Sequence, residues 1–309
     1  MTLLDMQRVF SRILTDKAFR QSFINGDAPS RAMYQLTERE LESLRRLRWD
    51  RVGLQAEFLA HRRLELAFSA LPLTGLLLHG QLHDQLDRFC AEHPPAPQAG
   101  GPVWAEAVRL CQFVGKLVAE GTLRPAWAWD LIRYERCVLD LTVSSESAAS
   151  AIRVAELNAG ASWPPADSDD LVPVAGPHAK IAQFSYPLPD LTKLLRSGGL
   201  PDDERPLDLP LLILFYQRAR GPVHVVRINE ATAALIDACD GDRTIADVAD
   251  HLSRTVGSGA KARTRVAAAI AQLRDAGVVG LRRGRKAAAD RELPGLAATE
   301  PGHDAVAEP

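Results

Sequence analysis

The sequence predicts an α+β protein, in which an all-helical N-terminal domain precedes a smaller domain of strands and three helices. Three observations predict this class. Apolar residues recur at helical spacing through the first 145 residues. Short apolar runs of strand character begin only after residue 178. The chain has 309 residues, more than one core usually organises, which favours two domains.

The N-terminal domain, residues 1–145, begins with a clear amphipathic pattern. Its first apolar stripe consists of Met6, Val9, Phe10, Ile13 and Leu14. Thr37-Glu38-Arg39-Glu40 is a capping box, which predicts a helical segment that begins there and ends before Pro72. The buried side of that segment is expected to carry Leu41, Leu44, Phe58, Leu59 and Leu66. Further helices are predicted over 75–92, 103–119 and 125–141.

Residues 146–178 differ from what precedes them, because they are polar, small and rich in proline. Trp163-Pro164-Pro165 and Gly176-Pro177 are typical of turns and loops. We therefore expect a linker here, without a regular element.

The C-terminal domain, residues 179–285, opens with strands. These are predicted at Lys180–Tyr186, Leu211–Arg218 and Val223–Ile228, with a short helix around Asp190–Arg196. Arg220-Gly221-Pro222 turns the chain between the last two strands.

Three helices follow the strands. Asn229 caps the first, over 230–239, and Thr244 caps the second. The third is predicted over 262–276, and Val278–Leu281 returns as a short strand. Strands, three helices and a final strand, the wing, form the order of a winged helix-turn-helix. The tail, residues 286–309, has no periodicity and is expected to be disordered.

Bulk composition excludes several classes of function. The net charge of −2 gives the whole molecule no bias toward nucleic acid or anionic membranes. The four cysteines are far apart and form no CxxC pair, so a zinc site of the finger or ribbon type is not expected. No apolar run reaches the roughly 20 residues that span a bilayer, and the first residues lack a secretory signal. We therefore expect a cytoplasmic protein.

The C-terminal domain resembles a known peptide-binding family. The segments Arg227–Gly241, Thr244–Val248 and Val266–Val279 are similar to the recognition element of ribosomally synthesised, modified peptide pathways. The peptide chaperone of pyrroloquinoline quinone biosynthesis belongs to that family. Ile228 stands where the family usually has Leu. The resemblance implies binding of a precursor peptide's leader.

The N-terminal half resembles, more faintly, the partner proteins of multinuclear non-haem iron oxidases in methanobactin and 3-thiaglutamate pathways. The residues that carry this resemblance are Leu82–Phe89, Glu92–Pro95, Trp127–Glu135 and Phe184–Gly198. It implies a non-catalytic subunit in a heterodimer with the oxidase. The iron would lie on the oxidase, which modifies a cysteine, and this chain would hold no cofactor.

Strand addition would supply the peptide site. A leader would pair with the edge of Val223–Ile228, where Val223, Val225 and Arg227 share one face. Its side chains would enter a groove against the third helix, whose side is expected to consist of Arg263, Val266, Ala267 and Ile270. Arg227 and Arg263 could pair with acidic leader residues.

DNA binding is the alternative function, because winged helices commonly bind duplexes. Residues 209–286 contain 13 Lys and Arg against 7 Asp and Glu, a net charge of +6. Lys261, Arg263 and Arg265 crowd the start of the third helix. Against this reading, Val266–Ala271 lacks the Arg, Asn and Gln that contact base edges. An enzyme with an unrecognised site is the third reading.

Other motifs favour structural roles. His79 and His83 stand at i, i+4, but neither an HExxH motif nor a third ligand accompanies them. Gly257–Lys261 lacks the full spacing of a phosphate-binding loop. The basic cluster Arg45–Arg48 is typical of a solvated helix face, with partner contact as the alternative.

Overall fold

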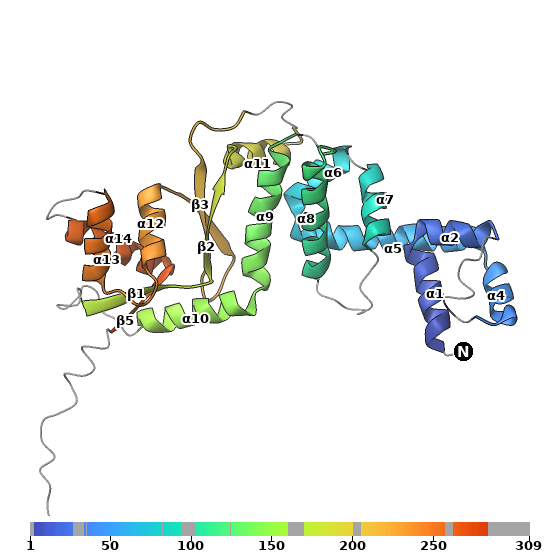
Figure 1. Cartoon of the computed structure of the whole chain (residues 1–309), viewed down its shortest axis with the longest axis horizontal. Helices are drawn as coiled ribbons and strands as arrows, with labels where there is room; N and C mark the ends of the chain where they lie inside the picture. The colour runs from blue at the N-terminus through green and yellow to red at the C-terminus, as the bar shows by residue number, and fades with distance from the viewer. Residues whose placement is uncertain are drawn as a thin grey trace, which may run out of the picture. The chain divides into compact units, whose positions relative to one another are not determined.

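The computed structural model describes residues 3–26, 34, 36–81, 83–93, 103–123, 125–159, 170–199, 205–256 and 262–283. Helices dominate the N-terminal part and small sheets appear after residue 170, so the predicted α+β class is confirmed (Figure 1). Contacts divide the chain into two compact units. Unit 1 comprises Met1–Ser144, Lys180–Phe215 and Val223–Ile228. Unit 2 comprises Ser145–Ala179, Tyr216–Pro222 and Asn229–Pro309.

Unit 1 begins with a small helical cluster. Its helices are α1 (Leu3–Thr15), α2 (Lys17–Ile24), α4 (Glu38–Arg45) and the start of α5 (Trp49–Ala70). The predicted capping box is confirmed, since Thr37 N donates to Glu40 at 2.8 Å and Thr37 Oγ1 accepts from Glu40 N. The core of this cluster includes Val9, Ile13, Phe19, Phe23, Leu41 and Leu44.

The segment after Thr37 is two helices rather than one, because the chain turns at Arg46–Arg48 between α4 and α5. Its buried side is partly different from the prediction. Leu41 and Leu44 are buried, whereas Phe58 is 61% exposed and Leu59 and Leu66 are also exposed. The buried positions of α5 are the smaller residues Val52, Ala56 and Ala67. Small side chains at these positions let neighbouring helices approach α5 closely, and the larger Leu64 and Phe68 are half-buried against the core.

The larger core of unit 1 lies among α5, α6 (Pro72–Gln81), α7 (His83–Glu92), α8 (Val103–Ala119) and α9 (Ala128–Val143). Pro72 starts α6, where its missing N–H is harmless. The structure divides the helix predicted over 75–92 into the end of α6 and α7. Among the largest fully buried side chains are Phe89, Phe113 and Trp127.

A three-stranded sheet belongs to the same unit, apart from the ends of two strands. Its strands are β2 (Ala179–Phe184), β3 (Leu211–Gln217) and β4 (Val223–Ile228), in the order β2-β3-β4. Together with α11 (Leu188–Arg196) the sheet packs beside α9 (Figure 1). Tyr134 on α9 meets Phe215 and Phe184 with ring centroids 5.3 and 6.3 Å apart. This aromatic contact joins the sheet to the helices, so the compact units do not follow the predicted boundary at residue 179.

Unit 2 contains α10 (Ser145–Ala159), β1 (Leu171–Ala175), α12 (Glu230–Ala238), α13 (Ile245–Val256), α14 (Ala262–Ala276) and β5 (Val279–Arg283). The prediction that 146–178 holds no regular element is wrong, since α10 and β1 lie there. Ser147, Ala151 and Val154 form the buried face of α10. Only Val154 among them is a strong apolar signal, so the helical period was weak. Residues 160–169 lie outside the described part.

The final strand also has an unexpected partner. β5 pairs antiparallel with β1, in a register that joins Leu171 to Arg283 and Ala175 to Val279. α10 packs against β5, and Gly280 permits the close approach. A Cβ at Gly280 would lie 2.9 Å from Leu157 Cδ1. The strand predicted at Val278–Leu281 therefore exists, but its partner comes from the predicted linker.

The three predicted C-terminal helices are confirmed, with their caps. Asn229 Oδ1 accepts from Thr232 N at 2.8 Å, and Thr244 Oγ1 accepts from Asp247 N at 3.1 Å. The winged helix-turn-helix arrangement stays a prediction. Gly257–Lys261 and the tail 286–309 lie outside the described residues. Within the described part of the chain, no helix is both long and apolar enough to cross a membrane.

Candidate peptide-binding surfaces

The edge of the sheet in unit 1 is the first candidate surface. In the order β2-β3-β4, β4 is terminal, so one of its sides is unpaired within the described chain. Gly221 precedes β4 with φ of +123°, a conformation that favours glycine, and it lets the five-residue connection from β3 turn tightly. An unpaired strand edge presents backbone N–H and C=O groups that another strand can bind.

The side chains of β4 are accessible on both faces. Val225 is 37% and Val226 45% exposed, and Arg227 is also exposed. Val223 is half-buried and packs against the large core of unit 1, so it anchors the strand. Arg227 makes no side-chain hydrogen bond or ion pair with another described residue. Among the described residues, β4 thus combines an edge without a strand partner, two exposed valines and a guanidinium, that of Arg227, without an ion-pair partner.

The predicted residues of α14, in unit 2, differ in accessibility. Arg263 is exposed and forms a bidentate ion pair with Asp250 of α13, at 3.0 Å to each carboxylate oxygen. Val266 and Ala267 are half-buried. Ile270 is fully buried and belongs to the core. The prediction that Ile270 contacts the peptide is therefore corrected. Its helical spacing indicated the face of α14 that packs into the core.

The Arg263–Asp250 pair affects how this surface could bind a peptide. Both side chains are more than half exposed, and exposed pairs add little to stability. The predicted groove would combine β4, which belongs to unit 1, with α14, which belongs to unit 2, and it stays a prediction.

A charged depression on α13 was missed from the sequence. It has a volume of about 780 Å³ and is lined by Arg243, Asp247, Asp250, His251, Ser253 and Arg254. These residues recur at i, i+3/i+4 and i+7, so they share one face of a helix. A charged helix face ordinarily only contacts solvent, and for this reason the spacing did not indicate a binding surface. The bidentate partner of Arg263 lies in this depression, so the charges of α13 and α14 form one polar surface.

The cysteines are poor nucleophiles. Cys111, Cys137 and Cys239 are buried and Cys90 is half-buried. Burial raises the pKa of Cys111 and of Cys239 to about 12, and it also raises the pKa of Cys90 and Cys137. These thiols are therefore protonated at neutral pH.

The described residues also form no recognisable metal-binding site. Within the described residues, no cluster of three or more His, Cys, Asp or Glu side chains could hold a metal ion. The side chains of His79 and His83 lie outside the described part.

Comparison with protein families identifies the C-terminal segment. Residues 213–279 match the family model described as Coenzyme PQQ synthesis protein D (PqqD). The match begins within β3, includes β4, α12, α13 and α14, and ends on the first residue of β5. No curated protein matches the chain. The match covers all three segments on which the resemblance of the C-terminal domain rested, and none of those given for the N-terminal half. This protein therefore carries a PqqD-like domain at its C-terminal end, and that domain contains the free edge of β4.

Proposed function

We propose that this chain is a non-catalytic accessory subunit that binds the leader of a ribosomally synthesised precursor peptide. It presents the peptide's core to a partner iron-dependent oxidase, which modifies a cysteine. The observation that carries the proposal is the coincidence of the PqqD match with an exposed edge strand, β4. Strand addition needs such an edge, because main-chain hydrogen bonds then supply affinity largely independent of sequence.

Side chains near this edge give the selectivity. Val225 and Val226 offer apolar contacts, and Arg227 offers a guanidinium that no described residue occupies. Arginine forks match carboxylates, so an acidic residue in the leader is the expected partner of Arg227.

The partner oxidase follows from the resemblance of the N-terminal half, and it would bind unit 1 in a heterodimer. The iron would lie on the oxidase, and this chain would hold no cofactor. The proposal places both proteins in the cytoplasm, where the substrate cysteine remains reduced.

The test begins with the full chain co-expressed with its co-encoded oxidase. Size exclusion should show a stable heterodimer, and fluorescence anisotropy should show binding of the labelled precursor leader. Arg227→Glu should weaken leader binding about tenfold, the effect of losing roughly 1.4 kcal/mol of a charge-assisted contact. Arg153→Glu is the matched control, because Arg153 is exposed on α10 and should not contact the leader.

DNA binding remains the second candidate, supported by the net charge of +6 over residues 209–286. A labelled duplex should show no binding at physiological salt. Duplex binding with a steep salt dependence, together with no leader binding, would contradict the proposal and favour the regulator.

A further inference from the structure

The two faces of β4 present different side chains to an added strand. Neighbouring residues of a strand point to opposite faces, so Val225 lies on one face and Val226 on the other, while Arg227 shares the face of Val225. All three side chains are exposed. Val223, at the start of the strand, packs against the large core of unit 1. From Val225 onward, a peptide added to β4 would therefore meet an accessible apolar side chain on each face.

This arrangement favours a different peptide from that of an ordinary half-buried strand. A strand with one apolar face alternates apolar and polar residues. A strand paired with β4 would instead place two successive residues opposite Val225 and Val226, one on each face. Two adjacent apolar residues in the peptide would cover both valines, whereas an alternating sequence would leave one valine beside a polar side chain.

Charge determines the neighbouring position of the peptide. The segment between Asp208 and Glu230 contains Arg218, Arg220 and Arg227 and no acidic residue. Glu230 is the acidic residue nearest to Arg227 along the sequence, and in the described part of the chain the two form no ion pair. A peptide residue opposite Arg227 would therefore meet a guanidinium that a carboxylate complements.

The direction of the peptide follows from the sheet. β3 and β4 are joined by five residues, too few for the crossover that parallel strands need, so these two strands are antiparallel. Antiparallel pairing is also slightly more stable per residue than parallel pairing. A peptide that continues the antiparallel order would meet Arg227 first, then Val226 and then Val225.

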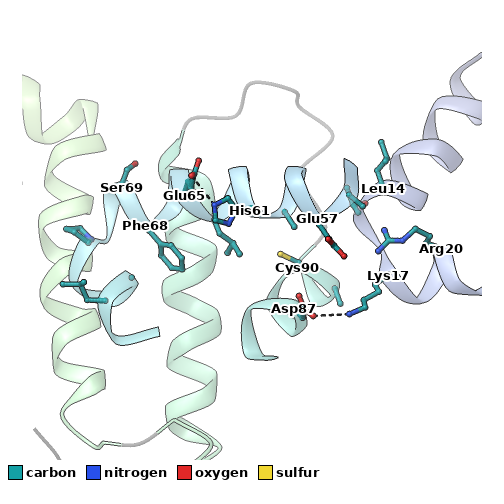
Figure 2. Close-up of a pocket in the computed structure, with 18 residues that line it drawn as sticks. Leu14, Lys17, Arg20, Glu57, His61, Glu65, Phe68, Ser69, Asp87 and Cys90 are labelled. Atoms are coloured by element: carbon teal, nitrogen blue, oxygen red, sulfur yellow. Dashed lines mark hydrogen bonds and ion pairs between the residues drawn. The ribbon is translucent and has the colours of Figure 1, made fainter. Parts of the chain in front are cut away.

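The groove along α5 in unit 1 shows no comparable preference for one charge. It has a volume of about 1070 Å³ and is shown in Figure 2. Its charged lining residues are Lys17, Arg20, Glu57, Glu65 and Asp87. Lys17 pairs with Asp87 at 3.2 Å, and Glu65 pairs with Arg62 at 3.0 Å. Because both signs are present and largely paired, this lining does not favour an acidic peptide.

We propose that β4 selects a leader segment in which an acidic residue is followed by two adjacent apolar residues. The three would pair, in an antiparallel register, with Arg227, Val226 and Val225 in that order. This inference rests on the proposed function, because it names the sequence that the leader-binding edge would recognise. It can fail while leader binding stands, since main-chain hydrogen bonds alone require no particular side chains.

A charge exchange tests the acidic position. Short overlapping synthetic fragments of the co-encoded leader, titrated into the full chain by fluorescence anisotropy, locate the segment that binds, and it should contain the acidic-apolar-apolar triplet. Changing its acidic residue to Lys should weaken binding about tenfold. Arg227→Glu should bind this Lys peptide at least threefold more tightly than the wild type does, because the charges match again. Arg153→Glu, exposed on α10, should bind it as weakly as the wild type.

Two threonine substitutions test the order of the apolar positions. Val226→Thr and Val225→Thr keep the β-branched shape and strand propensity of valine, so the fold should be retained. Each should weaken binding about threefold, the size expected for one cross-strand pair. The loss at Val226 should vanish when the peptide residue after the acid is already Thr, and the loss at Val225 when the next one is. Val143→Thr, exposed at the end of α9, should leave binding unchanged.

The outcomes separate this inference from the proposed function. If no fragment of the leader binds, the proposed function fails and this inference fails with it. If a fragment binds but the Lys peptide loses no affinity, or gains none with Arg227→Glu, the inference is wrong and leader binding stands. Coupling of the valines in the reverse order would indicate parallel pairing and overturn the proposed direction. Binding that is lost with Glu57→Lys and unaffected by Arg227→Glu would place the leader in the α5 groove instead.

Discussion

Individual buried polar side chains join separate elements in both units. In unit 1, Glu135 on α9 accepts from the backbone N–H groups of Leu73 and Thr74 at 2.7 Å each, which caps the start of α6. Asp130, also on α9, accepts from the backbone of Ser185 and Tyr186 after β2. Such contacts are between residues about 55 to 62 positions apart, so no local pattern could predict them.

His178 plays the corresponding part in unit 2. It is fully buried, and its Nδ1 lies 2.9 Å from Ser150 Oγ. Burial lowers the pKa of His178 from its ordinary value of 6.5, only partly offset by hydrogen bonds with the backbone of Gly277 and Val278. The neutral imidazole is therefore the form that the fold accommodates.

This burial predicts a pH dependence of stability. The unfolded chain takes up the proton at a higher pH than the folded chain. Above about pH 6.5 both states are neutral at this residue, so protonation of His178 should not lower the free energy of unfolding. It should fall as pH drops below that value, by up to about 1.4 kcal/mol per pH unit for this one group. Urea denaturation between pH 5 and 7.5 measures the slope. His178→Gln should have a shallower slope, and an unchanged slope would mean that other groups cause it.

Among the elements, glycines show where close packing is required. At Gly280 a Cβ would meet Leu157 Cδ1 at 2.9 Å and the Val154 backbone at 3.4 Å, because α10 lies directly on β5. At Gly53, within α5, a Cβ would meet nothing within 4 Å. The two positions therefore respond oppositely to added volume.

Gly280→Val should lower the free energy of unfolding by about 1–3 kcal/mol, because the extra methyl groups overpack the contact between α10 and β5. Gly53→Ala should raise it by about 0.5–1 kcal/mol through better helix propensity. Urea titrations of the full chain measure both changes. A neutral Gly280→Val would indicate that α10 does not pack on β5 in solution.

Helices and strands with clear local signals were predictable almost to the residue. The helices at 103–119 and 262–276 and the strand at 223–228 have the predicted bounds. α10 was not predicted because its buried face is Ser147, Ala151 and Val154, which give only a weak apolar period. Of the predicted peptide contacts, Ile270 proved to be buried, since the same helical stripe can mark a core or a binding face.

At the scale of the whole molecule, the order of helices and strands along the sequence did not predict which segments form each compact unit. Residues 180–215 and 223–228 belong with the N-terminal helices, and residues 145–179 belong with the C-terminal ones. Tyr134 packing on Phe215 and β1 pairing with β5 decide this division. Both are contacts between distant segments that no single stretch of sequence specifies. The PqqD-like segment consequently contributes β4 to one unit and its three helices to the other.

The most direct test of leader binding on β4 is a pair of proline substitutions in the full chain, Val225→Pro and Val226→Pro. Neighbouring N–H groups of a strand point to opposite edges, so one proline removes a bond to β3 and the other an outward donor. An edge strand tolerates the second kind. We predict that one variant keeps the wild-type circular dichroism and thermal midpoint yet binds the labelled leader at least tenfold more weakly. A well-folded proline variant at each outward position of β4 with wild-type affinity would contradict strand addition.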